Sequence, residues 1–156
     1  MKTTLYAAYG SNLNIKQMSY RCPTAKPIAK SWLHDYRLVF KGSPRGAHAT
    51  VIPEEGQEVP LVIWEISAQD ERYLDRYEGV AGGYYTKEYM EVEVDGEMKE
   101  VLIYIMTPQH FGTPAHHYFQ TIQQGYMDFN LPMETLDEAL KHSYQRAFIY
   151  QNKQEA

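Results

Sequence analysis

Apolar and polar positions along the chain predict a succession of strands in its first two thirds. Met90, Val92 and Val94 alternate with acidic residues, and this period of two is typical of a strand with one buried face. The Asp95-Gly96 pair that follows indicates a tight hairpin turn. The segments predicted as strands are residues 3–9, 36–40, 49–52, 59–66, 90–94 and 101–106.

Helices are predicted from capping signals and from the spacing of apolar positions between strands. Ser67 is followed three residues later by Asp70, which resembles a capping box, and Gly79 marks the end of that helix. Asn14 is expected to cap a shorter helix, with Gln17 completing its capping box. The predicted helices cover residues 14–20, 67–78, 114–129 and 133–144.

These elements fit one domain of the α+β class. A chain of 156 residues is long enough for one compact core and short for two. We therefore assign residues 1–150 to a single domain and residues 151–156 to a polar tail. Most consecutive strands are joined by short turns, which favours a mixed or antiparallel sheet that curls toward a small β-barrel with helices around it.

Charge and hydropathy limit the classes of partner. The net charge of −5 argues against nucleic acid, because binding to phosphates requires a basic surface. No apolar run approaches the roughly 18 residues that would span a membrane. The chain begins with a strand-like segment and not with the apolar core of a signal peptide. We expect a cytoplasmic protein whose partner is a small molecule, without nucleic acid and without a membrane.

The cysteine and histidine residues do not suggest a metal centre. Cys22 is the single cysteine, which excludes a disulfide within the chain and agrees with a reducing compartment. His116 and His117 are adjacent, so they cannot share one face of a helix. The G-x-S-x-G motif of many serine hydrolases is also absent. We expect no metal and no other cofactor.

The segment Tyr9-Gly10-Ser11-Asn12 lies where a predicted strand passes directly into a helix. Free backbone N–H groups at a helix start attract anions, and Ser11 and Asn12 add side-chain donors. Neither of the glycine-rich phosphate-binding motifs, G-x-x-x-x-G-K-[ST] and G-x-G-x-x-G, is present. A single carboxylate therefore fits this loop better than a polyphosphate. Considered alone, the spacing favours a plain turn with an N-cap over an anion site.

Glu78 is the candidate acid or base. It lies at the predicted end of a helix, where the negative end of the helix dipole disfavours a carboxylate by ~0.3–1 kcal/mol. Its neighbours in sequence are Tyr, Val and Gly, with no adjacent Lys or Arg. Both effects predict a raised pKa, as a general acid/base near neutral pH requires. Considered alone, the pattern favours an exposed glutamate before a glycine C-cap over a catalytic group.

Together the two segments resemble the γ-glutamylcyclotransferase family. Residues 6–13, Tyr-Ala-Ala-Tyr-Gly-Ser-Asn-Leu, are close to the family signature YxAYGSNL. Residues 77–80 and 83–85 are similar to the family segment EGV…G-Y that holds its essential glutamate. Weaker similarities are Tyr104-Ile105-Met106-Thr107, and Tyr118 seven residues before Gly125. The order and approximate spacing agree from residue 5 to about residue 142.

The resemblance implies a mixed β-barrel with surrounding helices and a reaction without water, metal or cofactor. The substrate's α-amino group attacks its own γ-carbonyl, which closes 5-oxoproline and releases an amine. By similarity, Glu78 is the catalytic acid/base. The expected substrate-binding residues are Tyr6, Ala7, Ala8, Tyr9, Gly10, Ser11, Asn12, Tyr85 and Tyr118.

Two alternatives to this function stay open at this point. The first is a binding module for γ-glutamyl metabolites, and the second is a hydrolase or acyltransferase on the same fold. Residues 22–60 carry no motif that the resemblance explains, and they are where contacts to the leaving amine are expected. The amine is therefore undetermined: an amino acid, an alkylamine, a lysine ε-amine or an amino sugar. The oligomeric state is not indicated.

Overall fold

The computed structural model describes the backbone of residues 2–155 and the side chains of residues 2–149. The helical elements are the 3-10 turn η1 (Ser11–Leu13) and the α-helices α1 (Ile15–Arg21), α2 (Ala68–Tyr77), α3 (His116–Asp128) and α4 (Met133–Glu155). The strands are β1 (Thr3–Ala8), β2 (Lys26–Lys41), β3 (His48–Ser67), β4 (Tyr85–Val94) and β5 (Glu97–Met106).

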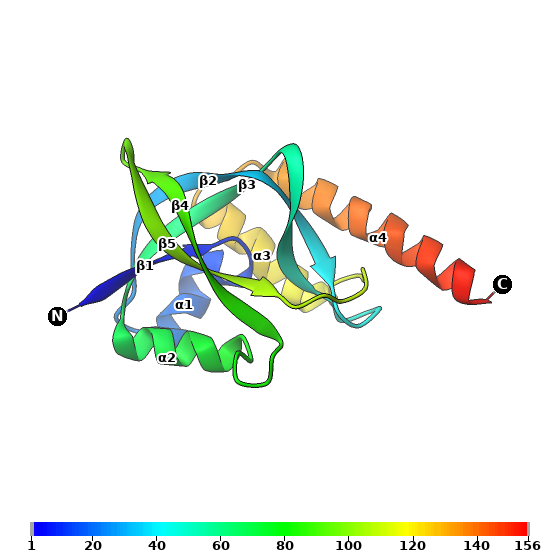
Figure 1. Ribbon diagram of the computed structural model, residues 1–156, viewed down its shortest axis with the longest axis horizontal. Helices are drawn as coiled ribbons and strands as arrows, with labels where there is room; N and C mark the ends of the chain where they lie inside the picture. The colour runs from blue at the N-terminus through cyan, green and yellow to red at the C-terminus, as the bar shows by residue number, and fades with distance from the viewer. Residues whose placement is uncertain (1, 156) are drawn as a thin grey trace.

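The strands form one five-stranded sheet in the order β2-β3-β1-β5-β4. β1 is the central strand, antiparallel to β3 and parallel to β5, and the remaining pairs are antiparallel. The α+β prediction is therefore confirmed. Because β1 lies in the middle, the loop that follows it emerges at the centre of the sheet end (Figure 1).

The predicted barrel closure is wrong, because the edge strands β2 and β4 are not joined by a backbone ladder. They do approach one another: the hydroxyl of Ser31 in β2 donates to the carbonyl oxygen of Glu93 in β4 over 2.6 Å. The sheet thus curls until its edge strands β2 and β4 approach each other. In a closed barrel these two strands would be paired through their backbones, whereas here the Ser31 hydroxyl makes the contact.

β3 is one strand, although the sequence predicted two strands separated by Pro53-Glu54-Glu55-Gly56. Across from β3, the pairing of β2 jumps from His34 opposite Glu58 to Tyr36 opposite Pro53. Asp35 lies at that jump with φ 63°, and its carboxylate accepts the Gly56 N–H over 3.0 Å. The turn residues therefore form a bulge inside one long strand, because Asp35 satisfies the backbone that leaves the ladder.

Local signals place the ends of α2 and of the β4–β5 hairpin correctly. The Ser67 hydroxyl accepts the Asp70 N–H and the Asp70 carboxylate accepts the Ser67 N–H, which completes the predicted capping box. Glu78 is the C-cap residue, as predicted. At the hairpin, Asp95 and Gly96 both have positive φ, the geometry of a type I′ turn.

α4 continues well beyond its predicted end at residue 144 and extends away from the sheet in Figure 1. It covers most of the predicted tail, while Ala156 lies outside the described residues. The division into a domain of residues 1–150 and a tail of residues 151–156 stays a prediction. Within the described residues, no helix combines the length and the hydropathy needed to cross a membrane.

α3 fixes the position of η1 through a very close contact. A Cβ on Gly125 would lie 2.6 Å from the Cβ of Leu13, so only glycine lets α3 approach this closely. The Asn14 amide adds a hydrogen bond of 3.0 Å to the carbonyl oxygen of Thr121. This packing brings the start of α3, with Tyr118, beside the loop that follows β1.

Candidate active site

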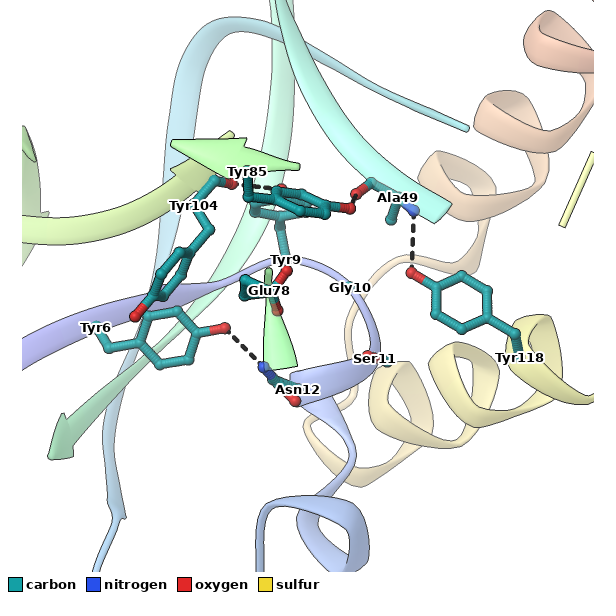
Figure 2. Close-up of a pocket in the computed structure, with 10 residues that line it drawn as sticks. All are labelled: Tyr6, Tyr9, Gly10, Ser11, Asn12, Ala49, Glu78, Tyr85, Tyr104 and Tyr118. Atoms are coloured by element: carbon teal, nitrogen blue, oxygen red, sulfur yellow. Dashed lines mark hydrogen bonds between the residues drawn. The ribbon is translucent and has the colours of Figure 1, made fainter. Parts of the chain in front are cut away.

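A pocket of ≈ 300 Å³ lies where β1 passes into η1. Figure 2 shows Glu78 among residues that come from β1 and the loop after it, and from β3, β4, β5 and α3. The lining includes Gly10, Ser11 and Asn12 from the loop and Ala49 from β3. Five tyrosines complete it: Tyr6, Tyr9, Tyr85, Tyr104 and Tyr118.

The loop is held rigidly by the Asn12 side chain. Its amide nitrogen donates to the Tyr6 hydroxyl over 2.9 Å, and its amide oxygen accepts from Arg21 over 2.9 Å. Asn12 is buried and both ends of its amide are occupied, so its side chain positions neighbours and is not a spare donor. The N–H groups of Ser11 and Asn12 form the first turn of η1, where no intrahelical partner is available to them.

Ala49 connects the opposite walls of the pocket through its backbone. Its N–H donates to the Tyr118 hydroxyl over 2.9 Å, and its carbonyl oxygen accepts the Tyr85 hydroxyl over 2.7 Å. Across the pocket, a Cβ built on Gly10 would lie 3.1 Å from the Ala49 Cβ. The absence of a side chain at Gly10 therefore decides how closely the loop approaches β3.

The tyrosines of the pocket form two groups, according to whether the hydroxyl proton is already donated to a protein acceptor. Tyr9 donates its hydroxyl proton to the carbonyl oxygen of Tyr104 over 2.6 Å, and Tyr85 donates to Ala49. Tyr104 donates to the Asp75 carboxylate over 2.7 Å. Tyr6 and Tyr118 instead accept hydrogen bonds, so each keeps its own proton for a ligand.

The pocket keeps its tyrosines neutral. Burial is the main cause that raises the pKa of Tyr6, Tyr9, Tyr85 and Tyr118, and the charge of Glu78 adds to it. A neutral phenol donates a hydrogen bond without adding a charge. Among the lining groups of this pocket, the carboxyl group of Glu78 is therefore the one whose pKa lies near neutral pH.

Burial raises the pKa of Glu78 from 4.5 to about 7, while the charge of Arg21 opposes the rise. Glu78 is the C-cap of α2, and its N–H donates to the Leu74 carbonyl oxygen over 2.8 Å. Gly79 follows with φ 63°, which ends the helix and turns the chain away. Near neutral pH both protonation states are populated, so this carboxyl group can accept a proton and return it.

Arg21 was not identified from the sequence. It lies in the last turn of α1, donates to Asn12, and places its guanidinium 4.4 Å from the centre of the Tyr77 ring. Among the ion pairs of the described residues, none involves Arg21. A half-buried cation without a carboxylate partner is thus available beside Glu78.

A second pocket of ≈ 480 Å³ adjoins the first, and we call it the outer pocket. It shares Ser11, Glu78, Tyr85 and Tyr118 with the inner one. The residues that only the outer pocket contains are Arg21, His48, Tyr77 and Tyr84. Glu78 therefore lies at the boundary between the two pockets, which we call chambers.

The structure brings most of the predicted site residues into one pocket: Tyr6, Tyr9, Gly10, Ser11, Asn12, Glu78, Tyr85 and Tyr118. Ala7 and Ala8 are not among the lining residues of the described pockets. They are fully buried in β1, opposite Ile63 and Val62 of β3, and so fix the strand from which the loop departs.

Other lining residues were missed, or had only a weak signal in the sequence. Tyr104 belongs to a short similarity noted above, but nothing local pointed to the pocket. Ala49 and His48 lie in the segment of residues 22–60, which carried no motif and was expected to contact the leaving amine. Their role depends on β3 lying beside the β1 loop, and only the tertiary structure gives that neighbour.

Within the described residues, no three His, Cys, Asp or Glu side chains lie together as metal ligands would. His116 and His117 are exposed at the start of α3, outside both pockets. Cys22 is buried with a pKa raised to about 12, mainly by that burial. The groups that line the two pockets and could take part in chemistry are the Glu78 carboxyl, the Arg21 guanidinium, the His48 imidazole and a set of phenols.

Known proteins resemble this chain in both sequence and structure. Residues 6–125 match the family described as "Gamma-glutamyl cyclotransferase, AIG2-like". The gamma-glutamylcyclotransferase of Homo sapiens is 34% identical, over 83% of this chain and 73% of the human protein. The mouse protein of the same name is 34% identical, over 85% of this chain and 75% of its own. A solved structure described as a gamma-glutamyl cyclotransferase superposes with a TM-score of 0.80 at 29% identity, over 88% of this chain and 86% of its own.

Proposed function

The chain belongs to the γ-glutamyl cyclotransferase, AIG2-like family, and on that premise we infer that it converts a γ-glutamyl amide into 5-oxoproline and a free amine. The observation that carries the assignment to this site is Glu78, a carboxyl group with a pKa of about 7 between the two chambers. A pure binding module does not require such a group, so that alternative is not favoured.

Glu78 is the proposed acid/base. The α-ammonium of the substrate is not a nucleophile until it loses a proton, and the Glu78 carboxylate accepts it. The amine then attacks the γ-carbonyl carbon, the new C–N bond closes the five-membered ring, and the old amide C–N bond breaks. Glu78 returns its proton to the departing nitrogen, and the ring nitrogen then loses its second proton, which the released amine takes up by way of Glu78 to leave as an ammonium ion. Two protons thus pass from the α-nitrogen to the leaving amine, and atoms and protons balance without water.

The glutamyl half is proposed to occupy the inner pocket. The N–H groups of Ser11 and Asn12 and the free hydroxyl protons of Tyr6 and Tyr118 are the donors available for its carboxylate and for the developing oxyanion. Because the attack is intramolecular, holding the geometry supplies much of the rate, with effective molarities of ~10⁵ M or more.

The pH dependence follows from the raised pKa of Glu78. At low pH this carboxyl is protonated and cannot accept the ammonium proton. We expect kcat/KM to rise with pH to a midpoint near Glu78's pKa of about 7, and then to flatten as the fraction of carboxylate saturates. A steady-state profile from about pH 5 to 9 measures this. A rate independent of pH across that range would exclude Glu78 as the base.

Direct detection of the product tests the function itself. A set of γ-glutamyl amides, with amino acid, alkylamine, lysine ε-amine and amino-sugar leaving groups, is incubated with the protein and analysed by mass spectrometry. We expect 5-oxoproline from at least one of them. Free glutamate in place of 5-oxoproline would indicate a hydrolase, and a new γ-glutamyl amide would indicate an acyltransferase.

We propose further that this enzyme works in the cytoplasm without a cofactor. Cys22 is the single cysteine of the sequence and no disulfide can form within the chain, which suits a reducing compartment. The steps above need only a proton acceptor, donors and a held geometry, all of which the chain supplies. The small-molecule γ-glutamyl substrate is its expected partner, and neither nucleic acid nor a membrane enters the scheme.

A further inference from the structure

Asp75, one turn before Glu78, closes the end of α2 through its backbone. Its carbonyl oxygen accepts the Val80 N–H over 3.0 Å, and the Arg76 carbonyl oxygen accepts the Gly79 N–H over 3.2 Å. These two bonds, together with the positive φ of Gly79, form the Schellman motif that ends many helices, and Glu78 is the residue that they enclose. The direction in which Glu78 leaves the helix is therefore set by a turn that Asp75 closes.

The side chain of Asp75 joins the same turn to the sheet. Its carboxylate accepts from the Tyr104 hydroxyl of β5 over 2.7 Å and from the Lys87 ammonium of β4 over 3.1 Å. Tyr104 and Lys87 are directly opposite each other in the β4–β5 ladder, so both side chains lie on one face and reach one carboxylate. Lys87 also binds Glu71, one turn earlier on the same side of α2, over 2.5 Å. Partly buried, charge-assisted hydrogen bonds thus hold the end of α2 to two strands.

Tyr104 carries this connection into the wall of the inner pocket. Its ring meets the Tyr6 ring edge to face, with 5.7 Å between ring centres (Figure 2), and its backbone carbonyl oxygen accepts the Tyr9 hydroxyl over 2.6 Å. Burial and the hydrogen bond to Asp75 raise the pKa of Tyr104, so its hydroxyl stays a donor at neutral pH. Asp75 itself lines neither chamber. A residue outside the site therefore connects the turn that carries Glu78 with two tyrosines that line the site.

We propose that Asp75 is a positioning residue for the reaction: through Tyr104 and Lys87 it fixes the distance between the Glu78 carboxyl group and the substrate in the inner pocket. The proposal rests on the proposed function, in which one carboxyl group takes protons from the α-nitrogen and delivers them to the leaving nitrogen. Both transfers require hydrogen-bond distance, and a displacement of about 1 Å can cost ~100-fold in rate. Helix ends fray, so a base at a helix C-cap needs such an anchor.

Tyr104→Phe tests the connection without changing any charge, because it removes only the hydroxyl that Asp75 accepts and keeps the ring beside Tyr6. With the γ-glutamyl amide that turns over fastest in the product screen, we expect kcat to fall by ~10-fold. KM should change by less than ~3-fold, since the donors proposed to hold the glutamyl half are untouched. Asp75→Ala removes the contacts with both strands and should lower kcat by ~10–100-fold. Asp75→Asn keeps an acceptor for the Tyr104 hydroxyl, so its kcat should lie between those of Asp75→Ala and the unmodified protein.

A double variant shows whether the two residues act as one unit. When Asp75→Ala and Tyr104→Phe are combined, kcat should fall no further than in Asp75→Ala alone, whereas independent roles would multiply the two losses. Each kcat is expressed per folded molecule and measured below the unfolding transition, so a loss of stability alone does not change it. Tyr89→Phe on β4 and Asp137→Ala on α4 are matched controls and should retain full kcat, since both residues are exposed and line neither chamber.

The titration of Glu78 gives a readout that does not depend on turnover. Burial is the main cause of its raised pKa, so a Glu78 side chain that is no longer held in place becomes more hydrated, and its pKa falls from about 7 toward 4.5. NMR of the labelled carboxyl carbon measures this pKa in the unmodified protein and in Tyr104→Phe, and the signal is identified by its loss in Glu78→Gln. The charged and titratable groups that surround Glu78 are the same in both proteins: Arg21 of α1, His48 of β3, Tyr6 and Tyr9 of β1 and its loop, Tyr85 of β4 and Tyr118 of α3.

We expect a lower midpoint for Tyr104→Phe both in this titration and in the pH profile of kcat/KM. An unchanged kcat or an unchanged pKa of Glu78 in Tyr104→Phe would overturn the proposal, and so would a raised KM with kcat preserved. In each of these cases 5-oxoproline would still form, and the proposed function would stand. No 5-oxoproline from the unmodified protein would overturn both. Because Tyr104→Phe removes one hydroxyl and no ring, it decides the question even where Asp75→Ala does not fold.

Discussion

Replacing Glu78 with glutamine is expected to lower kcat by ~10²–10⁴ while the protein remains folded. Glutamine keeps the size of the side chain and its hydrogen-bonding capacity, but it cannot accept the proton of the substrate's ammonium group. Formation of 5-oxoproline, followed by mass spectrometry under saturating substrate, measures the effect. Glu91→Gln on the exposed face of β4 is the matched control and should retain full activity.

Glu78→Gln is also expected to change the pH dependence of stability, which is a test independent of activity. Folding raises the pKa of Glu78 from 4.5 to about 7, so the folded protein holds this proton more tightly than the unfolded chain. The contribution of Glu78 to stability is therefore full below pH 4.5 and is lost as the pH rises through about 7. Relative to the unmodified protein, Glu78→Gln should gain on the order of 1–3 kcal/mol between pH 4 and pH 8.

Thermal or denaturant unfolding at the two pH values checks this shift. A variant that loses activity and gains relative stability at pH 8 identifies Glu78 as a half-buried carboxyl group that serves the reaction at a cost in stability. Near-normal turnover by Glu78→Gln would refute the proposed mechanism. A large loss of activity with no pH-dependent change in stability would show that folding does not raise the pKa of Glu78.

The second large effect is expected at Gly10, where valine should abolish the binding of 5-oxoproline. The φ of Gly10 is −126°, which lies outside the left-handed region that favours glycine. The constraint is packing instead, because a Cβ would lie 3.1 Å from the Cβ of Ala49. Branched valine would push the loop and β3 apart, and would move the Tyr85 and Tyr118 hydroxyls that Ala49 holds.

Calorimetric titration with 5-oxoproline measures the loss, and a compensating pair of variants tests its cause. Gly10→Ala alone should weaken binding less than valine does. Combining Gly10→Ala with Ala49→Gly removes the second methyl group of the contact, so the double variant should bind more tightly than Gly10→Ala. Unchanged affinity in Gly10→Val would mean that the loop is only a turn. Absence of any rescue would mean that the contact with Ala49 is not what Gly10 protects.

Local sequence signals correctly predicted the elements that are stabilised by interactions between residues close together in the sequence. The capping box of Ser67 and Asp70 and the hairpin at Asp95-Gly96 are interactions over a few residues, so pattern alone was sufficient. The prediction of a break between two strands at residues 53–56 is wrong, because it did not include a residue from the neighbouring strand. Asp35 on the neighbouring strand satisfies the Gly56 N–H, and the chain continues as one strand through a bulge.

The candidate site likewise contains residues that a local pattern reveals and residues that only tertiary packing brings to it. Glu78 at a helix end and the loop of residues 9–12 were found in the sequence, because each is one contiguous segment with a characteristic composition. The predicted rise in the pKa of Glu78 has the direction that the structure gives, although burial is its main cause. The helix dipole and the apolar neighbours in sequence predict this direction, whereas the opposing charge of Arg21 reaches Glu78 only through the tertiary structure.

The sequence by itself therefore determined the α+β class, the family resemblance and the position of the candidate acid/base, Glu78. Only the tertiary structure decided which residues complete the site around Glu78. Ala49 and His48 on β3 and Arg21 on α1 reach the pocket because β1 lies at the centre of the sheet and delivers its loop between them. Contacts of this kind join segments tens of residues apart, and no local pattern of residues encodes them, because they arise only when strands and helices pack together.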